Sequence, residues 1–319
     1  MHESLITEGV KTQEFSYSNG ISLIKLNDKH LNLVSSIAHE EFNKCGGFIF
    51  EENPVVAALK ISEKQFTSQK FTIKAKEKSN LITKLIAEVD HEKVKSIIEK
   101  LSSFQNRYYR SRHGVSSQQW IFDHWSKLAK GMSGIKVEKI KHSRYDQPSV
   151  ILTIEGSDLK EEYIVLGGHG DSIEGWSSSD SMRAPGADDN ASGLATLTEI
   201  IRILLAQGHR PRRTLQFISY AAEEVGLRGS NDIASRYARA GKDVKGVLQF
   251  DMTNYSSSTY DIVFIRDYTT STLTEYLISL LGIYLPDFKW GSDRCGYACS
   301  DHASWYRNGF PVAFPFEST

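Results

Sequence analysis

Cysteine is scarce in this chain of 319 residues, which contains only Cys45, Cys295 and Cys299. Three cysteines are too few for a small scaffold held together by many disulfides. They are also too few for a structural zinc site with four sulfur ligands. From the residues alone, Cys295 and Cys299 are either two free thiols or the two ends of a very small disulfide loop.

The chain also has neither an excess of charge of one sign nor a long apolar run. The 38 Lys and Arg residues almost balance the 39 Asp and Glu residues, which leaves a net charge of -1. We therefore expect no nucleic-acid partner and no membrane surface as partner. No apolar run approaches the ~18 residues that a membrane-spanning helix needs. The first eleven residues have neither the basic nor the apolar region of a signal peptide, which indicates a cytoplasmic protein or a chain without its natural start.

Residues 1–80 differ in pattern from the rest of the chain. They contain short alternating runs, typical of strands, at residues 21–26 and 66–73, and they end in a lysine-rich polar stretch over residues 70–80. Such a stretch is typical of an exposed connector, where a protease could cut. We therefore expect a small N-terminal α+β region, 1–80, followed by a large domain, 81–319.

Helical and strand-like patterns alternate through the large domain. Apolar residues at helical spacing predict helices at residues 81–101, 115–128, 191–205, 225–240 and 273–281. Runs rich in β-branched residues predict strands at residues 149–154, 163–166, 214–220, 247–250 and 261–265. This alternation predicts an α/β fold with a mixed, mostly parallel central sheet flanked by helices.

Four short motifs rich in carboxylates lie beside the predicted strands. They are GGHGDS at residues 167–172, APGADDNASG at residues 184–193, AAEEVG at residues 221–226 and FDMTN at residues 250–254. Three of them follow a predicted strand, and in open α/β sheets the ligand crevice lies outside the carboxyl ends of the strands. We therefore expect the motifs to converge in one pocket.

Each motif alone has an ordinary structural interpretation. Asp188 and Asp189 could simply cap the helix that follows them. Glu223 and Glu224 could form a solvated helix start, and Asp251 could make an Asx-turn. The four motifs together favour a metal site, because a buried cluster of carboxylates is costly unless cations neutralise it.

The types of ligand also predict a mechanism. One histidine with several carboxylates and no thiolate suits zinc, cobalt or manganese. A carboxylate that bridges two such metals holds them ~3.5–4 Å apart and acidifies a water between them. A neighbouring carboxylate, Glu223 or Glu224, can take the proton of that water and pass it to a leaving amine. The residues alone do not say which of the two does so.

Together the motifs resemble those of the co-catalytic dizinc aminopeptidases of the bacterial secreted leucyl aminopeptidase family. The resemblance covers residues 81–319 and includes two longer segments, AAEEVGLRGS at residues 221–230 and CGYACSDHASW at residues 295–305. It implies a zinc aminopeptidase that releases apolar, Leu-like residues from peptides with a free N-terminus. The expected cofactors are two zinc ions.

Carried over by position, the resemblance implies a set of metal ligands. His169 and Asp251 would bind one zinc ion, and Glu224 would bind the other. Asp188 would bridge the two ions, and the peptide bond from Asp188 to Asp189 would be cis.

The resemblance assigns the catalytic proton transfer to Glu223, as the general base. Asp171 would orient the ring of His169 from behind.

The resemblance further implies a substrate pocket beside the metals. A disulfide between Cys295 and Cys299 would hold Tyr297 near the reaction centre, where its hydroxyl could stabilise the oxyanion. Met252 would line an apolar pocket for the N-terminal side chain of the substrate.

Residues 1–80 would correspond to the family's pro-region, which assists folding and blocks the site until an activating protease removes it. The family is exported, so the resemblance implies a secreted, monomeric zymogen. Cys45 could reach a zinc ion as an inhibitory ligand or be an inert thiol. The family has one more histidine shortly after the segment that matches residues 315–318. This chain stops there, so we expect the zinc site at Glu224 to be weak and this form to be less active.

Two other interpretations stay open. The chain could be a non-catalytic binding domain that keeps the fold without the metals. It could also be a related metal-dependent carboxypeptidase or amide hydrolase, although such enzymes need a basic residue for the substrate carboxylate and none can be placed from the sequence. His302 aligns with a structural histidine and not with the missing ligand.

Overall fold

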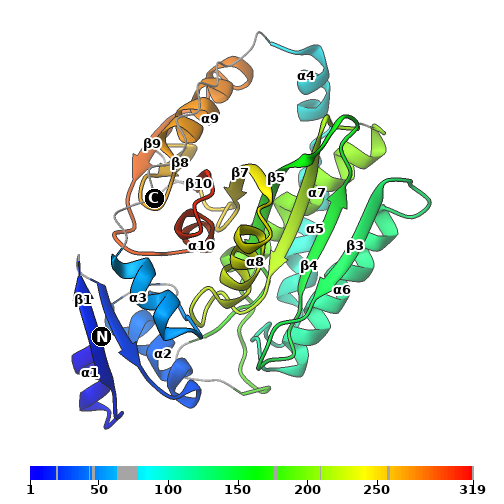
Figure 1. Ribbon diagram of the computed structural model, residues 1–319. Coiled ribbons are helices and arrows are strands. Elements are labelled where there is room, and N and C mark those ends of the chain that lie inside the picture. Colours follow the sequence, from blue (N-terminus) through cyan, green and yellow to red (C-terminus); the bar gives the residue numbers. More distant parts are fainter. Residues whose placement is uncertain are drawn as a thin grey trace.

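The computed structural model describes residues 1–18, 21–42, 44, 47–62, 78–174, 179–208, 210–256 and 259–317. A central sheet with helices on both faces forms the bulk of the molecule, and the N-terminal part lies at one side of it (Figure 1). The predicted strand at residues 66–73, most of the lysine-rich stretch, and Cys45 fall outside the described residues. Within the described part of the chain, no helix combines the length and the apolar character needed to cross a bilayer.

The N-terminal part is a small α+β unit. Its elements are α1 (His2–Thr7), β1 (Gln13–Ser18), β2 (Ile21–Lys25), η1 (Asp28–His30), α2 (Leu31–Phe42) and α3 (Pro54–Ser62). The strands β1 and β2 form an antiparallel pair, which confirms the strand predicted at residues 21–26. Leu5 of α1 packs against Val34 and Ile37 of α2, so this unit has an apolar core of its own.

The large domain is built around an eight-stranded sheet. Its strands are β3 (Ile135–Ile140), β4 (Ser149–Ile154), β5 (Leu159–His169), β6 (Arg213–Tyr220), β7 (Asp243–Gln249), β8 (Ile262–Ile265), β9 (Trp290–Asp293) and β10 (Val312–Phe316). They lie in the order β3-β4-β6-β5-β7-β10-β8-β9. The central strands β6, β5, β7 and β10 are parallel, whereas β4 and β8 run against their neighbours β6 and β10. The predicted mixed, mostly parallel sheet is confirmed.

Helices cover both faces of this sheet (Figure 1). The helices of the large domain are α4 (Asn80–Ala87), α5 (His91–Ser102), α6 (Arg112–Leu128), α7 (Gly193–Ala206), α8 (Arg228–Arg239), α9 (Ser271–Tyr284) and α10 (His302–Arg307). On one face, α5, α6 and α7 contribute Leu101, Trp125 and Leu197 to a common core. On the other face, Ile233 of α8 and Trp305 of α10 pack against the strands.

Side-chain caps set the starts of two helices. The carboxylate of Asp90 accepts hydrogen bonds from the backbone N–H groups of Glu92 and Lys93, at 3.0 and 3.4 Å. This cap divides the helical pattern that begins at residue 81 into α4 and α5. The hydroxyl of Ser111 accepts a hydrogen bond from the N–H of Gly114 at 2.9 Å, so α6 begins earlier than the apolar spacing predicts.

The chain changes its winding direction at β5, and this change positions the site. It crosses through α7 to β6 on one side of β5, and then returns through α8 to β7 on the other side. Crossovers that diverge in this way leave a crevice at the carboxyl ends of the parallel strands. His169 at the end of β5, and the segments that follow β6 and β7, meet at this crevice.

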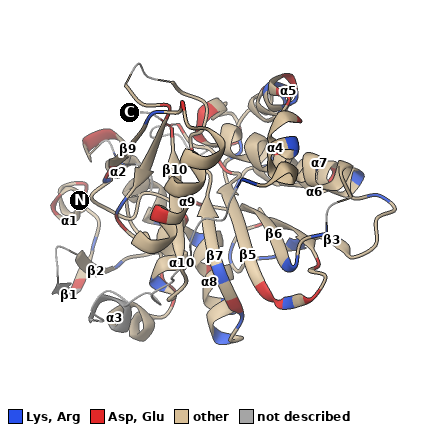
Figure 2. Ribbon diagram, turned by 90° about the horizontal axis from the view of Figure 1, so that it is seen from above, with Lys and Arg blue, Asp and Glu red and all other residues tan. Residues whose placement is uncertain are grey.

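Charged residues are distributed over the surface with both signs mixed. Figure 2 shows Lys and Arg beside Asp and Glu on the outer loops and at the strand ends. Many of them form exposed ion pairs, such as Arg212 with Asp158 at 2.9 Å and Lys160 with Glu155 at 2.8 Å. Pairs of this kind contribute little to stability, so packing of the two apolar layers holds the domain together.

Candidate metal centre

Three side chains from separate segments meet in the crevice. His169 is the last residue of β5, Asp251 lies just past β7, and Asp189 belongs to the turn η2 (Ala187–Ser192) that precedes α7. The Nε2 atom of His169 lies 2.9 Å from Oδ1 of Asp189 and 3.4 Å from Oδ1 of Asp251. One ligand atom from each residue lies within 4.8 Å of the others. These separations suit three ligands of one cation.

The structure places Asp189, and not Asp188, beside His169. The cis peptide bond expected from Asp188 to Asp189 instead joins Asp189 to Asn190, so that prediction is wrong by one residue. Asp188 points away from the cluster, where its Oδ1 accepts a hydrogen bond from the backbone N–H of Asn254 at 3.3 Å. The structure therefore brings Asp189, and not Asp188, into the cluster with His169 and Asp251.

The hydrogen bonds of the Asn190 side chain explain why Asp189, and not Asp188, lies at the crevice. Its Oδ1 accepts hydrogen bonds from the N–H groups of Gly193 and Met252, at 3.0 and 3.2 Å. Its Nδ2 donates to the carbonyl oxygen of Phe250 at 2.9 Å. These bonds fasten Asn190 to the end of β7, and they leave the preceding residue, Asp189, at the crevice.

Asp171 holds the segment after β6 in place behind the cluster. Its two carboxylate oxygens accept hydrogen bonds from the backbone N–H groups of Glu223 and Glu224, at 2.9 and 3.2 Å. The Nδ1 atom of His169 lies 3.2 Å from the carbonyl oxygen of Asp171 and 3.5 Å from its Oδ1. Asp171 therefore fixes the ring of His169 and the backbone of both glutamates at once.

Burial changes the protonation of the cluster. It raises the pKa of Glu223 well above its usual range, despite the attraction of His169. Burial, with the repulsion of Asp189, raises the pKa of Glu224 to about 7, and burial also raises the pKa of Asp251. Burial alone would lower the pKa of His169, but Asp251 and Glu223 raise it well above its usual value. Without metal the cluster therefore retains protons to offset its negative charge.

The donor atoms of the cluster fit divalent cations. Both carboxylate oxygens of Glu223, Oε2 of Glu224 and Oδ1 of Asp251 are buried and have no hydrogen-bond partner among the described residues. Buried polar atoms are rarely left without a partner, and nitrogen and oxygen donors without a thiolate suit zinc, cobalt or manganese. His169, Asp189 and Asp251 fit one such ion.

Sequence analysis does not identify Arg107, which is fully buried behind the crevice. Its guanidinium donates to the carbonyl oxygens of Gly170, Pro185 and Gly186, at 3.0, 2.5 and 2.9 Å. It thereby ties the loop after β5 to the turn that carries Asp189. Gly186 has a φ of +49°, and a Cβ there would meet the guanidinium at 2.7 Å. A single arginine between α5 and α6 belongs to no motif, so nothing in the sequence points to it.

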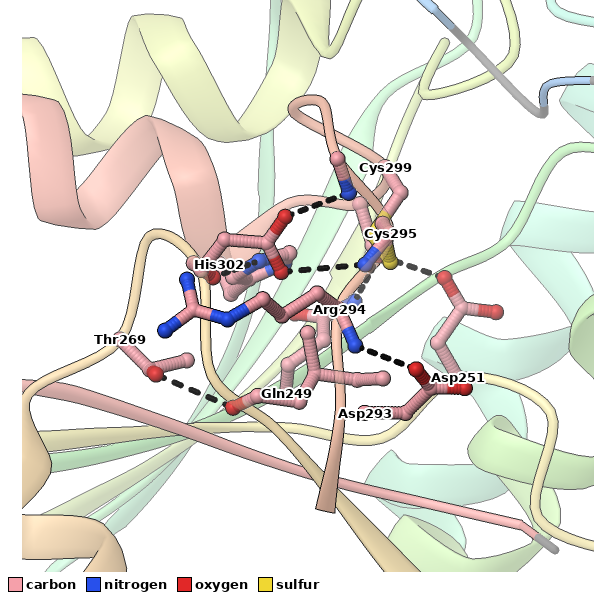
Figure 3. Close-up of a disulfide and its surroundings, with 12 residues drawn as sticks. Gln249, Asp251, Thr269, Asp293, Arg294, Cys295, Cys299 and His302 are labelled. Carbon is pink, nitrogen blue, oxygen red and sulfur yellow. Dashed lines mark hydrogen bonds between the residues drawn. A yellow bond between two sulfur atoms is a disulfide. The ribbon is translucent and has the colours of Figure 1, made fainter. Parts of the chain in front are cut away.

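The predicted disulfide between Cys295 and Cys299 is confirmed. The carboxylate of Asp267 accepts hydrogen bonds from the N–H of Cys295 and of the following residue, at 3.2 and 2.6 Å. Next to Cys299, the hydroxyl of Ser300 donates to Oδ2 of Asp251 at 2.5 Å. Figure 3 shows Asp251 beside the disulfide loop, so the loop is connected directly to a metal-ligand candidate.

The remaining candidate residues lie around the crevice. Tyr297 is half-buried in the disulfide loop, and the Nζ of Lys44 lies 4.9 Å from the centre of its ring. Met252 is half-buried, and its backbone is held by Asn190. His302 is fully buried, its Nε2 lies 3.2 Å from a backbone carbonyl oxygen, and burial lowers its pKa to about 3. The substrate roles of Tyr297 and Met252 stay predictions.

Residues 149–318 match the sequence profile of Peptidase family M28. A probable leucine aminopeptidase of Arthroderma benhamiae is 35% identical over 305 residues, which cover 94% of this chain and 82% of that protein. A probable aminopeptidase of Saccharomyces cerevisiae is 39% identical over 241 residues. That match covers 73% of this chain but 64% of the yeast protein, so the chain spans less than two thirds of this relative.

Two solved structures from Legionella pneumophila have the same fold. The LapA aminopeptidase has a TM-score of 0.83 and 28% identity, over 97% of this chain and 84% of its own. LapB has a TM-score of 0.82 and 26% identity, over 100% of this chain and 86% of its own. The similarity to LapB therefore includes the N-terminal α+β unit.

Proposed function

This chain belongs to Peptidase family M28, and from that premise we propose that it removes apolar, Leu-like residues from the free N-terminus of peptides, using two zinc ions. Its relatives are named leucine aminopeptidases, and its site has the donors of a metal centre. The protein is thus a metal-dependent aminopeptidase. The metal identity, the number of ions and the side-chain preference are the finer parts of the proposal.

One observation carries the proposal: a buried metal-ligand cluster lies directly beside two further buried glutamates. His169, Asp189 and Asp251 would hold one ion, and Asp189 with Glu224 would face the second. When bound, the ions acidify a water and polarise the scissile carbonyl. Glu223 would accept the proton of the attacking water and donate it to the leaving amine.

The loops around the crevice would supply the contacts to the substrate. The hydroxyl of Tyr297 donates a hydrogen bond to the oxyanion, where a fixed donor stabilises developing charge. Met252 contributes a flexible apolar wall to the pocket for the N-terminal side chain. The names of the relatives, which are leucine aminopeptidases, favour an aminopeptidase over a carboxypeptidase.

The same proposal extends to maturation. Residues 1–80 would act as a pro-region that is removed by an activating protease, and the mature enzyme would work outside the cell as a monomer. The N-terminal unit packs against the segment after β6, where the hydroxyl of Ser35 donates to the carbonyl oxygen of Glu224 at 2.6 Å. This contact supports a blocking role, because it lies beside the proposed centre.

Hydrolysis of two leucine substrates tests the proposal. The purified chain, loaded with zinc and treated with a protease that cleaves between residues 63 and 80, would be given leucine p-nitroanilide and its N-acetyl derivative. We expect hydrolysis of the free amine only, loss of activity with a chelator, and recovery with zinc. Equal hydrolysis of the acetylated compound would contradict an aminopeptidase, and failure to retain any divalent metal would favour a non-catalytic domain.

A further inference from the structure

The N-terminal unit is fixed against the candidate centre by several contacts, one of them from helix α2. Ser35 donates to the backbone of Glu224 at 2.6 Å, and the backbone N–H of Phe50 donates to the carbonyl oxygen of Gly226 at 2.9 Å. The guanidinium of Arg228 lies 4.3 Å from the centre of the Phe50 ring. The N-terminal unit therefore contacts the segment after β6 at two places, through Ser35 of α2 and through Phe50.

His39 lies one helical turn after Ser35, so both side chains face the same segment. The Nε2 atom of His39 lies 3.4 Å from Oε2 of Glu224. Both atoms are buried and neither has a hydrogen-bond partner among the described residues. The side chain of Glu224 is 3% exposed and that of His39 is 22% exposed, so a buried carboxylate oxygen of Glu224 faces the imidazole nitrogen at ion-pair distance.

This separation suits two ligands of one ion. Zinc binds imidazole nitrogen and carboxylate oxygen at ~2.0–2.2 Å, so two ligands in tetrahedral geometry lie about 3.3–3.5 Å apart. The distance from His39 to Glu224 falls in this range, and so does the 3.4 Å distance from His169 to Asp251. The carboxylate of Asp189 also acts electrostatically on His39, as do Glu224 and Glu40, so negative charge surrounds this imidazole from both elements.

We propose that His39 is a ligand of the second divalent cation, through Nε2, together with Glu224. This inference rests on the proposed two-metal function and adds a ligand from the N-terminal unit in the full chain, before the proposed pro-region is removed. The cation would then join α2 to the segment after β6. Metal binding would therefore stabilise the docked position of the N-terminal unit, and metal removal would loosen it.

Metal titration of the full chain tests the ligand. Zinc binding would be measured by calorimetry and by metal analysis for the wild type, His39→Ala and His39→Gln. We expect two ions in the wild type, and at least ~10-fold weaker binding of one ion in both variants, since losing a direct ligand costs at least as much as losing a supporting residue. His91→Ala is the matched control, because His91 is 91% exposed and lies outside the cluster.

Limited proteolysis gives a readout that is independent of activity. With zinc, residues 31–50 of the wild type should resist cleavage, and a chelator should speed cleavage about tenfold. In His39→Ala the rate should be fast with or without zinc. Ser35→Ala removes a docking hydrogen bond and keeps the ligand, so its cleavage should still respond to zinc.

The outcomes separate this inference from the proposed function. Two ions bound with unchanged affinity in both His39 variants would overturn the ligand assignment and leave the aminopeptidase intact. A wild type that binds no divalent ion would overturn both. Unfolding curves measured in chelator check that the variant folds. If wild type and His39→Gln give equal curves, the loss of an ion is due to the missing ligand. If His39→Gln is much less stable in chelator and also loses the ion, the ligand assignment is overturned.

Discussion

Each of three carboxylates at the candidate centre has its own specific contact. Asp171 bonds two backbone N–H groups, Asp251 receives the hydroxyl of Ser300, and Asp189 faces His169. Unpaired charges at such depth are costly. The affinity for cations therefore comes from the cluster as a whole. The hydrogen bonds of each carboxylate decide which of its oxygen atoms faces the cation.

The two adjacent aspartates offer a matched pair of substitutions. We expect Asp189→Asn to lose metal and to lower kcat/KM more than ~100-fold, because a ligand shared by both ions is lost. Asp188→Asn should retain both ions and change kcat/KM less than ~10-fold, since Asp188 bonds Asn254 instead. Metal analysis and leucine p-nitroanilide kinetics measure both. The reverse ranking would contradict the geometry of the turn.

Substitution of Glu223 by glutamine should affect kcat, whereas the same substitution of Glu224 should affect metal binding. Glu223→Gln keeps the shape and the backbone bond to Asp171 but cannot accept a proton. We expect kcat to fall ~10²–10⁴-fold with both ions retained. Glu224→Gln should instead weaken binding of one ion. Comparing metal content with kcat for the two variants checks this, and loss of metal in Glu223→Gln would show that it is a ligand.

Among the structural elements, the loop after β5 and the turn η2 depend on a common anchor. Arg107 donates to three backbone carbonyl oxygens in these two segments and lies close to the charges of Asp189, Asp171 and Glu224. Burial lowers its pKa to about 10, so it remains charged at neutral pH. The anchor thus places the turn of Asp189 against the strand end of His169.

Loss of this anchor should affect stability and metal binding together. We expect Arg107→Met to lower the free energy of unfolding by about 3 kcal/mol or more, because each unpartnered buried carbonyl costs ~1–3 kcal/mol. Arg107→Lys keeps the charge but not the fork of donors, so it should recover part of the loss. Denaturant unfolding in chelator and zinc titration measure both effects. Normal metal affinity in a folded Arg107→Met protein would contradict a positioning role.

Over the whole molecule, the site lies between two separately packed units. The sheet supplies the ligands at its strand ends, and the N-terminal unit, with its own apolar core, covers the segment that carries Glu224. With His39 as the proposed ligand, both units would share the free energy of metal binding. Stability of the whole chain should accordingly depend on metal and on pH.

The pH dependence of the metal-free protein follows from Glu224. Burial raises its pKa to about 7 in the folded state, from 4.5, so the folded protein binds more protons than the unfolded chain between these values. The stability from this group is complete below about pH 4.5 and is lost as pH rises through about 7. We expect the chelated wild type to lose more stability from pH 5 to 8 than Glu224→Gln. Zinc should abolish the difference, and parallel curves in chelator would contradict the shift.

The sequence by itself determined the type of fold and the set of interacting motifs. Helical and alternating apolar patterns locate most central elements, because burial of one face imposes a period within a single segment. The His and carboxylate motifs stand at the strand ends, where chain order alone predicts convergence. The strands β3, β9 and β10 are not among the predicted strands. Of these, β9 has only four residues, one of them glycine, which is too short to establish a period.

Only the tertiary structure decided which atoms meet. Asp188 and Asp189 are equivalent in the sequence, and hydrogen bonds of Asn190 to residues about 60 positions away select Asp189. His39 reaches Glu224 because α2 docks through Ser35, 189 positions from its partner. Such contacts depend on how separate elements pack. A local pattern records which face of an element is buried, but it does not record which distant segment covers that face.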